Sequence, residues 1–142
     1  MGQFVEHTAV AACEGTRWQA EVHRGWRIGS VANGGYVLAL VGRALSEALN
    51  QPDPLSINAF YLAPVLLGEV EIAVESLSET RSTHFASADL KQQGELKLRA
   101  TAAYTDLDKL RGPDWTNVTP PKVPAFDDAA SVSYTHLRAH ET

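Results

Sequence analysis

Residues 33–49 read NGGYVLALVGRALSEAL, and this stretch decides the fold of the chain. Its apolar residues recur at helical spacing, at Val37, Leu40, Val41, Ala44, Leu45, Ala48 and Leu49. The other face is also mostly apolar, and a helix that is hydrophobic nearly all round is buried. We therefore expect a buried helix from about Gly35 to Leu49, which Asn50 and Pro52 bring to an end.

Segments with strand patterns lie on both sides of this helix. We expect the strands, in chain order, at residues 16–22, 55–62, 69–75, 83–90 and 96–104. Residues 55–62 carry apolar side chains on both alternating faces, which predicts a central, covered strand. The Gln93-Gly94 pair suits the turn before the last strand, because it tolerates positive φ. Consecutive strands with short turns predict an antiparallel meander.

One long buried helix with one strand before it and four after it excludes a βαβ arrangement. The helix must then lie on one face of an antiparallel sheet. The predicted fold class is therefore α+β, and the arrangement is the hotdog architecture in outline, with a sheet wrapped around one long central helix.

The composition bounds the classes of function. The chain has 142 residues, 44% of them hydrophobic, and a formal net charge of −5. This length suits one compact domain, and scattered Lys and Arg disfavour a nucleic-acid partner. The longest apolar run, residues 36–41, is too short to span a membrane, and the first residues lack a secretory pattern. We expect a cytoplasmic protein, with Cys13 as a buried, inert thiol.

The composition changes after Leu107. Residues 108–130 contain Gly112-Pro113 and Pro120-Pro121 without any apolar period, as a linker does. Residues 131–142 follow no pattern and resemble a translated sequencing adapter. We expect a domain at residues 1–107, a Pro-containing linker at 108–130, and an unstructured, non-native tail at 131–142.

The middle of the chain resembles the N-terminal half of the bacterial acyl-CoA thioesterase II (TesB-like) family. The resemblance rests on Trp26, Asn33-Gly34-Gly35-Tyr36, Phe60-Tyr61-Leu62-Ala63-Pro64 and Gln93-Gly94. The family usually has Arg where this chain has Ala63. Members carry two hotdog units, and their recognised catalytic Asp, Gln and Thr or Ser lie in the second unit. The resemblance therefore assigns these catalytic roles to no residue of this chain.

The resemblance implies hydrolysis of acyl-CoA to a free fatty acid and CoA, with this chain as one half of a double-hotdog unit. It also implies a partner, either a second copy of the chain or another hotdog unit. A non-catalytic acyl-CoA-binding or scaffolding domain is the alternative. A hotdog hydratase is disfavoured, because it needs a close Asp–His pair that the spacing does not supply.

The helix start can support thioester chemistry. Hydrolysis requires stabilisation of negative charge on the carbonyl oxygen, and leading helix amides carry partial positive charge. We expect the Gly35 and Tyr36 amides to make the oxyanion contact, with Gly34 allowing close approach of the substrate. Asn33 would cap the helix or hold the water. The Asn-Gly-Gly run fits a purely structural tight turn equally well.

Other candidates are weaker. Arg81 could contact a CoA phosphate or be a solvated charge. The aromatic residues Trp18, Trp26, Phe60 and Tyr61 could line an acyl tunnel or pack in the core. Phe60 is our candidate among them for substrate binding.

No general base stands out. We interpret Asp53 as a turn residue, Asp89 as a solvated carboxylate and His84 as a partly exposed strand histidine. His136 and His140 have helical metal-ligand spacing but fall in the suspect tail, so we expect no metal site. No cofactor is expected either.

Overall fold

A computed structural model describes residues 2–112, 117–125 and 128. The chain divides into two units, Met1–Leu110 and Arg111–Thr142. In the second unit, residues 111–112 and 117–125 form no helix or strand and are exposed. The predicted tail at 131–142 lies outside the described residues, and the boundaries at 107 and 130 stay predictions.

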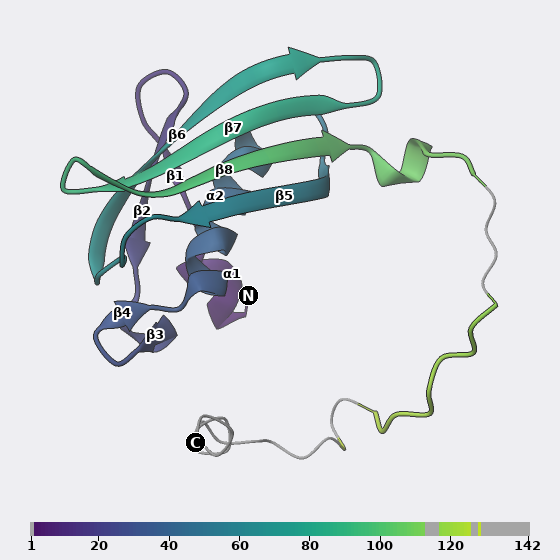
Figure 1. Cartoon of the computed structure of the whole chain (residues 1–142), viewed down its shortest axis with the longest axis horizontal. Coiled ribbons are helices and arrows are strands. Elements are labelled where there is room, and N and C mark those ends of the chain that lie inside the picture. The colour runs from purple at the N-terminus through teal and green to yellow at the C-terminus, as the bar shows by residue number, and fades with distance from the viewer. Residues whose placement is uncertain (1, 113–116, 126–127, 129–142) are drawn as a thin grey trace. The chain divides into compact units, whose positions relative to one another are not determined.

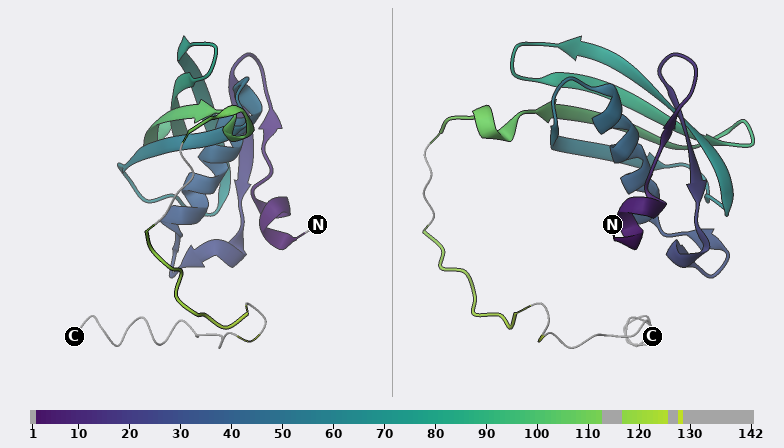
Figure 2. Two further views of the ribbon diagram at one scale, coloured as in Figure 1. Left: turned by 90° about the vertical axis from the view of Figure 1, so that its right-hand side faces the viewer. Right: turned by 180° about the vertical axis from the view of Figure 1, so that it is seen from behind.

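The first unit is a six-stranded antiparallel sheet with one long helix against it (Figures 1 and 2). The strand order is β1 (Ala11–Ala12), β2 (Arg17–Val22), β6 (Gly68–Glu79), β7 (His84–Gln92), β8 (Glu95–Thr105) and β5 (Asp53–Tyr61). The remaining elements are α1 (Gln3–His7), η1 (Arg24–Trp26), the hairpin β3 (Arg27–Ile28) with β4 (Val31–Ala32), α2 (Gly34–Ala48) and η2 (Leu107–Lys109). The predicted α+β hotdog arrangement is confirmed.

Helix α2 begins and ends within a residue of the prediction. Asn33 is its N-cap and Leu49 its C-cap. The helix packs against β2, β5, β6 and β7. The residues predicted to be buried, Val37, Leu40, Val41 and Ala44, are all at most 2% exposed. The all-round apolar pattern therefore predicted burial correctly.

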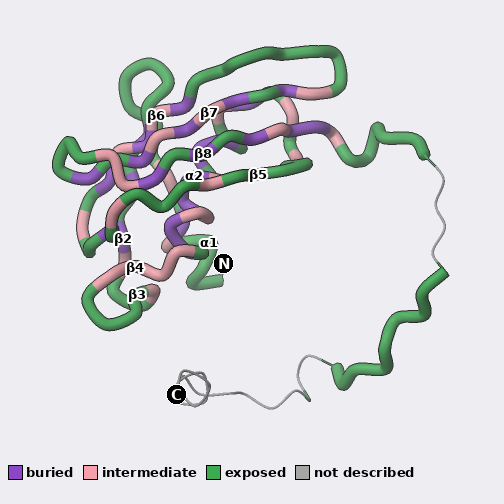
Figure 3. Tube along the Cα trace, in the orientation of Figure 1, coloured by how far each residue is buried: buried purple, intermediate pink, exposed green. Residues whose placement is uncertain are grey.

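Strand alternation supplies the other half of the core (Figure 3). The inward-facing residues include Val70, Ile72 and Val74 of β6, Ala86, Ala88 and Leu90 of β7, and Leu98, Ala100 and Ala102 of β8. Their neighbours along each strand point away from α2, as the two-residue period requires. The turn prediction is also confirmed, because Gln93 and Gly94 have φ values of 52° and 79°.

The prediction for residues 55–62 was wrong. β5 is the outer strand at one edge of the sheet, and it pairs with β8. Leu55 and Phe60 are 50% and 68% exposed. An apolar pattern on both faces does not fix strand order, and here α2 carries the chain to the far edge. The meander therefore holds only for β6, β7 and β8.

Two single-residue predictions were also wrong. Cys13 is exposed, because it lies in the loop after the two-residue strand β1. His84 is only 4% exposed, because its side chain points to the same, inward face of β7 as that of Ala86. Its Nε2 lies 2.7 Å from the Ser76 hydroxyl. Among the described residues, none of the helices is long and apolar enough to cross a membrane.

Replacing Leu40 with Ala should destabilise the first unit strongly. Leu40 is fully buried between α2 and the sheet, and removal of such a side chain typically costs about 2–5 kcal/mol. Leu38→Ala on the half-buried side of the same helix is the matched control, with an expected loss of roughly 1–2 kcal/mol. Urea unfolding measures both, and equal losses would contradict the burial pattern.

Candidate functional site

The amides at the start of α2 are mostly occupied. The Asn33 side-chain oxygen accepts hydrogen bonds from the Gly35 amide at 2.9 Å and the Tyr36 amide at 3.3 Å. The Asn33 amide donates to the Trp26 carbonyl at 2.7 Å. Within the described part of the chain, the Gly34 amide is the helix-start amide with no protein acceptor. It is therefore the one free to meet a ligand.

This arrangement changes the roles predicted for the helix start. Asn33 acts as the cap, and its carboxamide uses the two amides that were expected to make the oxyanion contact. A Cβ on Gly35 would lie 3.2 Å from the Asn33 oxygen, so Gly35 supports the cap geometry. The helix-start amide that remains without a protein acceptor is then that of Gly34.

The Tyr36 side chain has a structural position. Its hydroxyl lies 2.7 Å from the His7 carbonyl oxygen and 3.1 Å from that of Glu21, and it accepts a hydrogen bond from the His23 amide. The ring stacks on Trp26 with centroids 5.6 Å apart. Burial raises the pKa of Tyr36. This side chain joins α1 and β2 to α2 and faces away from solvent.

Sequence reasoning missed the cluster around Tyr36. The rings of His7 and His23 stack at 4.0 Å, and the Trp26 indole donates to His7 Nδ1 at 3.1 Å. Phe4 of α1 packs edge-on against Trp26 at 5.2 Å. No spacing in the sequence signals this cluster, because its members come from the five-residue helix α1, the turn η1 with its N-cap His23, and α2.

An apolar hollow of about 330 Å³ lies beside the helix start. Its walls are Val31, Ala32, Gly34, Val37, Tyr61, Leu62, Ala63, Pro64 and Val65. The Tyr61 hydroxyl donates to the Gly34 carbonyl at 3.0 Å, and the Ala32 amide donates to the Val65 carbonyl at 2.8 Å. The fold thus brings together two of the motifs on which the family resemblance rested, the one at residues 33–36 and the one at residues 60–64.

Phe60 is not part of this hollow. It pairs with Arg99 in the sheet and is 68% exposed. Its neighbours Ala59 and Tyr61 face the helix side, so Phe60 faces the other side. Of this Phe-Tyr pair, Tyr61 is the residue that lines the hollow, and a role of Phe60 in substrate binding stays a prediction. Ala63, in place of the family's usual Arg, leaves the hollow without a cation among its described walls.

Arg81 lies far from the helix start. It is exposed in the turn between β6 and β7, where His84 pairs with Tyr104 and Tyr104 pairs with Pro54 at the beginning of β5. Gly34 meets the opposite end of β5. Arg81 instead borders a separate hollow of about 240 Å³ near Lys109.

The titratable candidates also lie elsewhere. Asp89 accepts two hydrogen bonds from the Arg99 guanidinium, at 2.7 and 2.6 Å, and this pairing lowers the pKa of Asp89. Asp53 accepts from the Leu107 amide. No group of three or more metal-ligating side chains occurs in the described residues, and His136 and His140 lie outside them.

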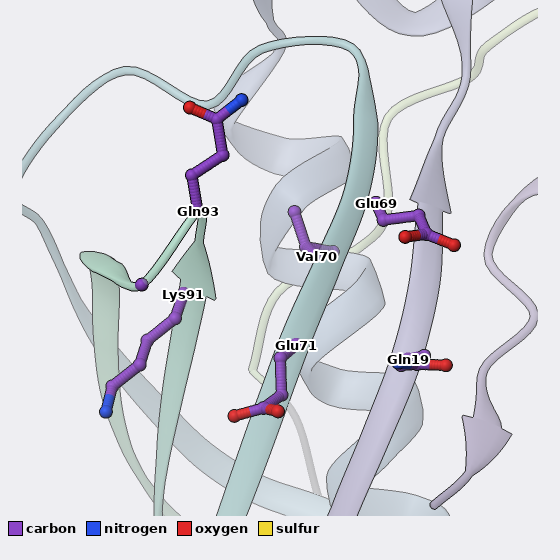
Figure 4. A pocket seen from close by; sticks show the side chains of 7 residues that line it. Gln19, Glu69, Val70, Glu71, Lys91 and Gln93 are labelled. Atoms are coloured by element: carbon purple, nitrogen blue, oxygen red, sulfur yellow. The ribbon is translucent and has the colours of Figure 1, made fainter.

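A further hollow, of about 230 Å³, lies on the sheet face turned away from α2 (Figure 4). Glu71 on β6 and Lys91 on β7 are register partners there. Gln19, Glu69 and Gln93 complete its polar rim. Opposite charges side by side on an outer sheet face are typical of a solvated surface, and of the family motifs only the Gln93-Gly94 turn reaches this hollow.

Replacing Tyr36 with Phe should destabilise the first unit by about 1–3 kcal/mol, because it leaves three partly buried backbone groups without their partner. Tyr61→Phe is the control, since its hydroxyl is exposed and its loss should cost about 0.5 kcal/mol. Thermal or urea unfolding measures both. A Tyr36→Phe protein as stable as the wild type would show that the hydroxyl does not join α1 to α2.

The comparisons with known proteins agree with this geometry. The family model "Acyl-CoA thioesterase N-terminal domain" matches residues 22–105, more than half of the chain. No curated protein matches significantly. A candidate thioesterase II from Thermobifida fusca has a TM-score of 0.81 at 26% identity, over 87% of this chain and 47% of that one.

Two further solved structures show the same fold. A hot dog protein from Alicyclobacillus acidocaldarius has a TM-score of 0.80 at 21% identity, over 94% of this chain and 50% of that one. The tesB protein of Mycobacterium avium subs paratuberculosis has a TM-score of 0.72 at 16% identity, over 84% of this chain and 46% of that one. The chain spans about half the length of these proteins. The match over residues 22–105 shows that the chain belongs to the acyl-CoA thioesterase N-terminal domain family.

Proposed function

We propose that this chain is one half of an acyl-CoA thioesterase of fatty acid metabolism, which hydrolyses acyl-CoA to a free fatty acid and CoA. The observation that carries the proposal is the apolar hollow beside the free Gly34 amide. In this proposal the hollow holds the acyl chain, and the thioester group lies at the helix start.

The helix start supplies the electrophilic part of the chemistry. Negative charge develops on the thioester oxygen as water attacks, and an N–H at a helix start stabilises it. Gly34 presents this N–H without a side chain of its own. The Gly35 and Tyr36 amides keep Asn33 in place and so hold the helix end rigid.

The same site lacks a group to activate the water. Among its described walls, none is a carboxylate or a histidine. A general base contributes typically about 10²–10⁴-fold to the rate. The chain alone is therefore expected to bind acyl-CoA weakly and to hydrolyse it slowly or not at all, with the base supplied by a second hotdog unit.

The edge strand β5 is the surface that we propose for that second unit. It exposes Leu55 and Phe60, and Leu62 follows directly. An exposed apolar edge promotes pairing with another strand. The opposite edge, β1, has only two residues and offers little to pair with. A second copy of this chain or another hotdog unit fits this edge.

Binding and turnover of octanoyl-CoA by the purified chain test the proposal. We expect weak binding by calorimetry, and Gly34→Val should weaken it at least about tenfold. Its added Cβ would lie 3.3 Å from the Tyr61 ring, so the valine side chain would fill space at the helix start. Gly25→Val is the matched control, because a Cβ there meets open space. Circular dichroism verifies that both variants fold.

Two results would count against this proposal. Equal binding by the Gly34→Val and Gly25→Val variants would remove the helix start from the site. Rapid turnover that disappears in His84→Ala or Asp89→Asn would place the base inside this chain. Binding of acyl-CoA without any turnover, even with a second hotdog unit present, would favour a non-catalytic acyl-CoA-binding domain.

A further inference from the structure

The hollow at the helix start is closed on one side by the Tyr61 ring. If Gly34 carried a Cβ, that atom would lie 3.3 Å from Tyr61 Cε1 and 3.6 Å from Cζ. The hydroxyl also donates to the Gly34 carbonyl. The Tyr61 ring therefore lies on the side of Gly34 from which a side chain would project, and it leaves the amide free.

The walls deeper in the hollow are fixed by packing and backbone bonds. Val37 is 2% and Val65 5% exposed, and the Val65 carbonyl is bonded to the Ala32 amide. Tyr61 differs from them because it is 53% exposed and ends the edge strand β5. One exposed hydrogen bond to Gly34 holds its ring, and such a bond contributes little to stability.

The hollow offers an alkyl chain only a limited amount of apolar surface. About 330 Å³ is at the lower end of the range of roughly 300–1,000 Å³ that is usual for ligand pockets. The apolar walls suit an alkyl chain, and the Tyr61 ring takes up space between Gly34 and solvent. A longer chain would have to displace this ring.

We infer that Tyr61 is the residue that limits the length of the acyl group, so that the site accepts short acyl chains and excludes longer ones. This inference rests on the proposed function. Removal of the ring enlarges the hollow on the side that Tyr61 closes. Removal of the hydroxyl alone leaves the ring, and therefore the length limit, in place.

The test is a chain-length series of CoA esters from acetyl to dodecanoyl, bound to the full chain and measured by calorimetry. The same series is run with free fatty acids below their micelle concentrations. Burial of each methylene should strengthen binding about fourfold until the hollow is full. We expect this rise to stop at a short chain in the wild type and at least two carbons later in Tyr61→Ala.

Two variants separate the ring from general effects. Tyr61→Phe should stop at the same length as the wild type. Phe85→Ala removes an equally large ring that is exposed on the outer face of β7, and it should also leave the limit unchanged. A shift in Phe85→Ala equal to that in Tyr61→Ala would overturn the assignment.

The outcomes separate this inference from the proposed function. Chain-length-dependent binding of CoA esters with the same limit in wild type and Tyr61→Ala overturns the role of Tyr61 alone. Binding of the fatty acids with a shifted limit, but no binding of the CoA esters, overturns the proposed function and supports the role of Tyr61. Absence of binding in both series overturns both.

Discussion

Burial of α2 against the sheet is the constraint on which the rest of the structure depends. A helix with apolar residues nearly all round cannot stay in water, so the sheet must cover it. Its capped start emerges where β5 ends. This position brings Gly34 and Tyr61 together although 27 residues separate them in the chain. The site is therefore a consequence of packing rather than of any local motif.

The parts that could be predicted are those with a strong local period. Helix α2 and the inward residues of β6 and β8 follow directly from the spacing of their apolar side chains. The order of the strands does not follow from this spacing. Helix α2 carries the chain across the sheet to the β5 edge, and the apolar pattern of a strand does not show which strand it pairs with. The burial of His84 was not predicted, because a polar residue in a strand is usually interpreted as exposed even where its side chain points to the core.

The helix start shows why the candidate site was predicted only in part. From the sequence, Asn33 can either cap the helix or leave the amides free, and a side-chain cap stabilises a helix by about 1 kcal/mol. The cap is formed, so the donor moves from Gly35 to Gly34. Phe60 differs by one residue from Tyr61, the residue that lines the hollow. A step of one residue along a strand changes the face of the sheet on which a side chain lies.

The proposed site has a physical connection to the proposed partner. Neighbouring strands lie about 4.8 Å apart, so a strand added to the β5 edge would run directly beside Tyr61. The group that limits the hollow and the edge that would receive a second unit are then one segment of the chain. A partner that supplies the missing base would also restrict the movement of the Tyr61 ring. In this arrangement catalysis and the choice of acyl chain depend on the same interface, which explains why half of a site can be well formed and still need its other half.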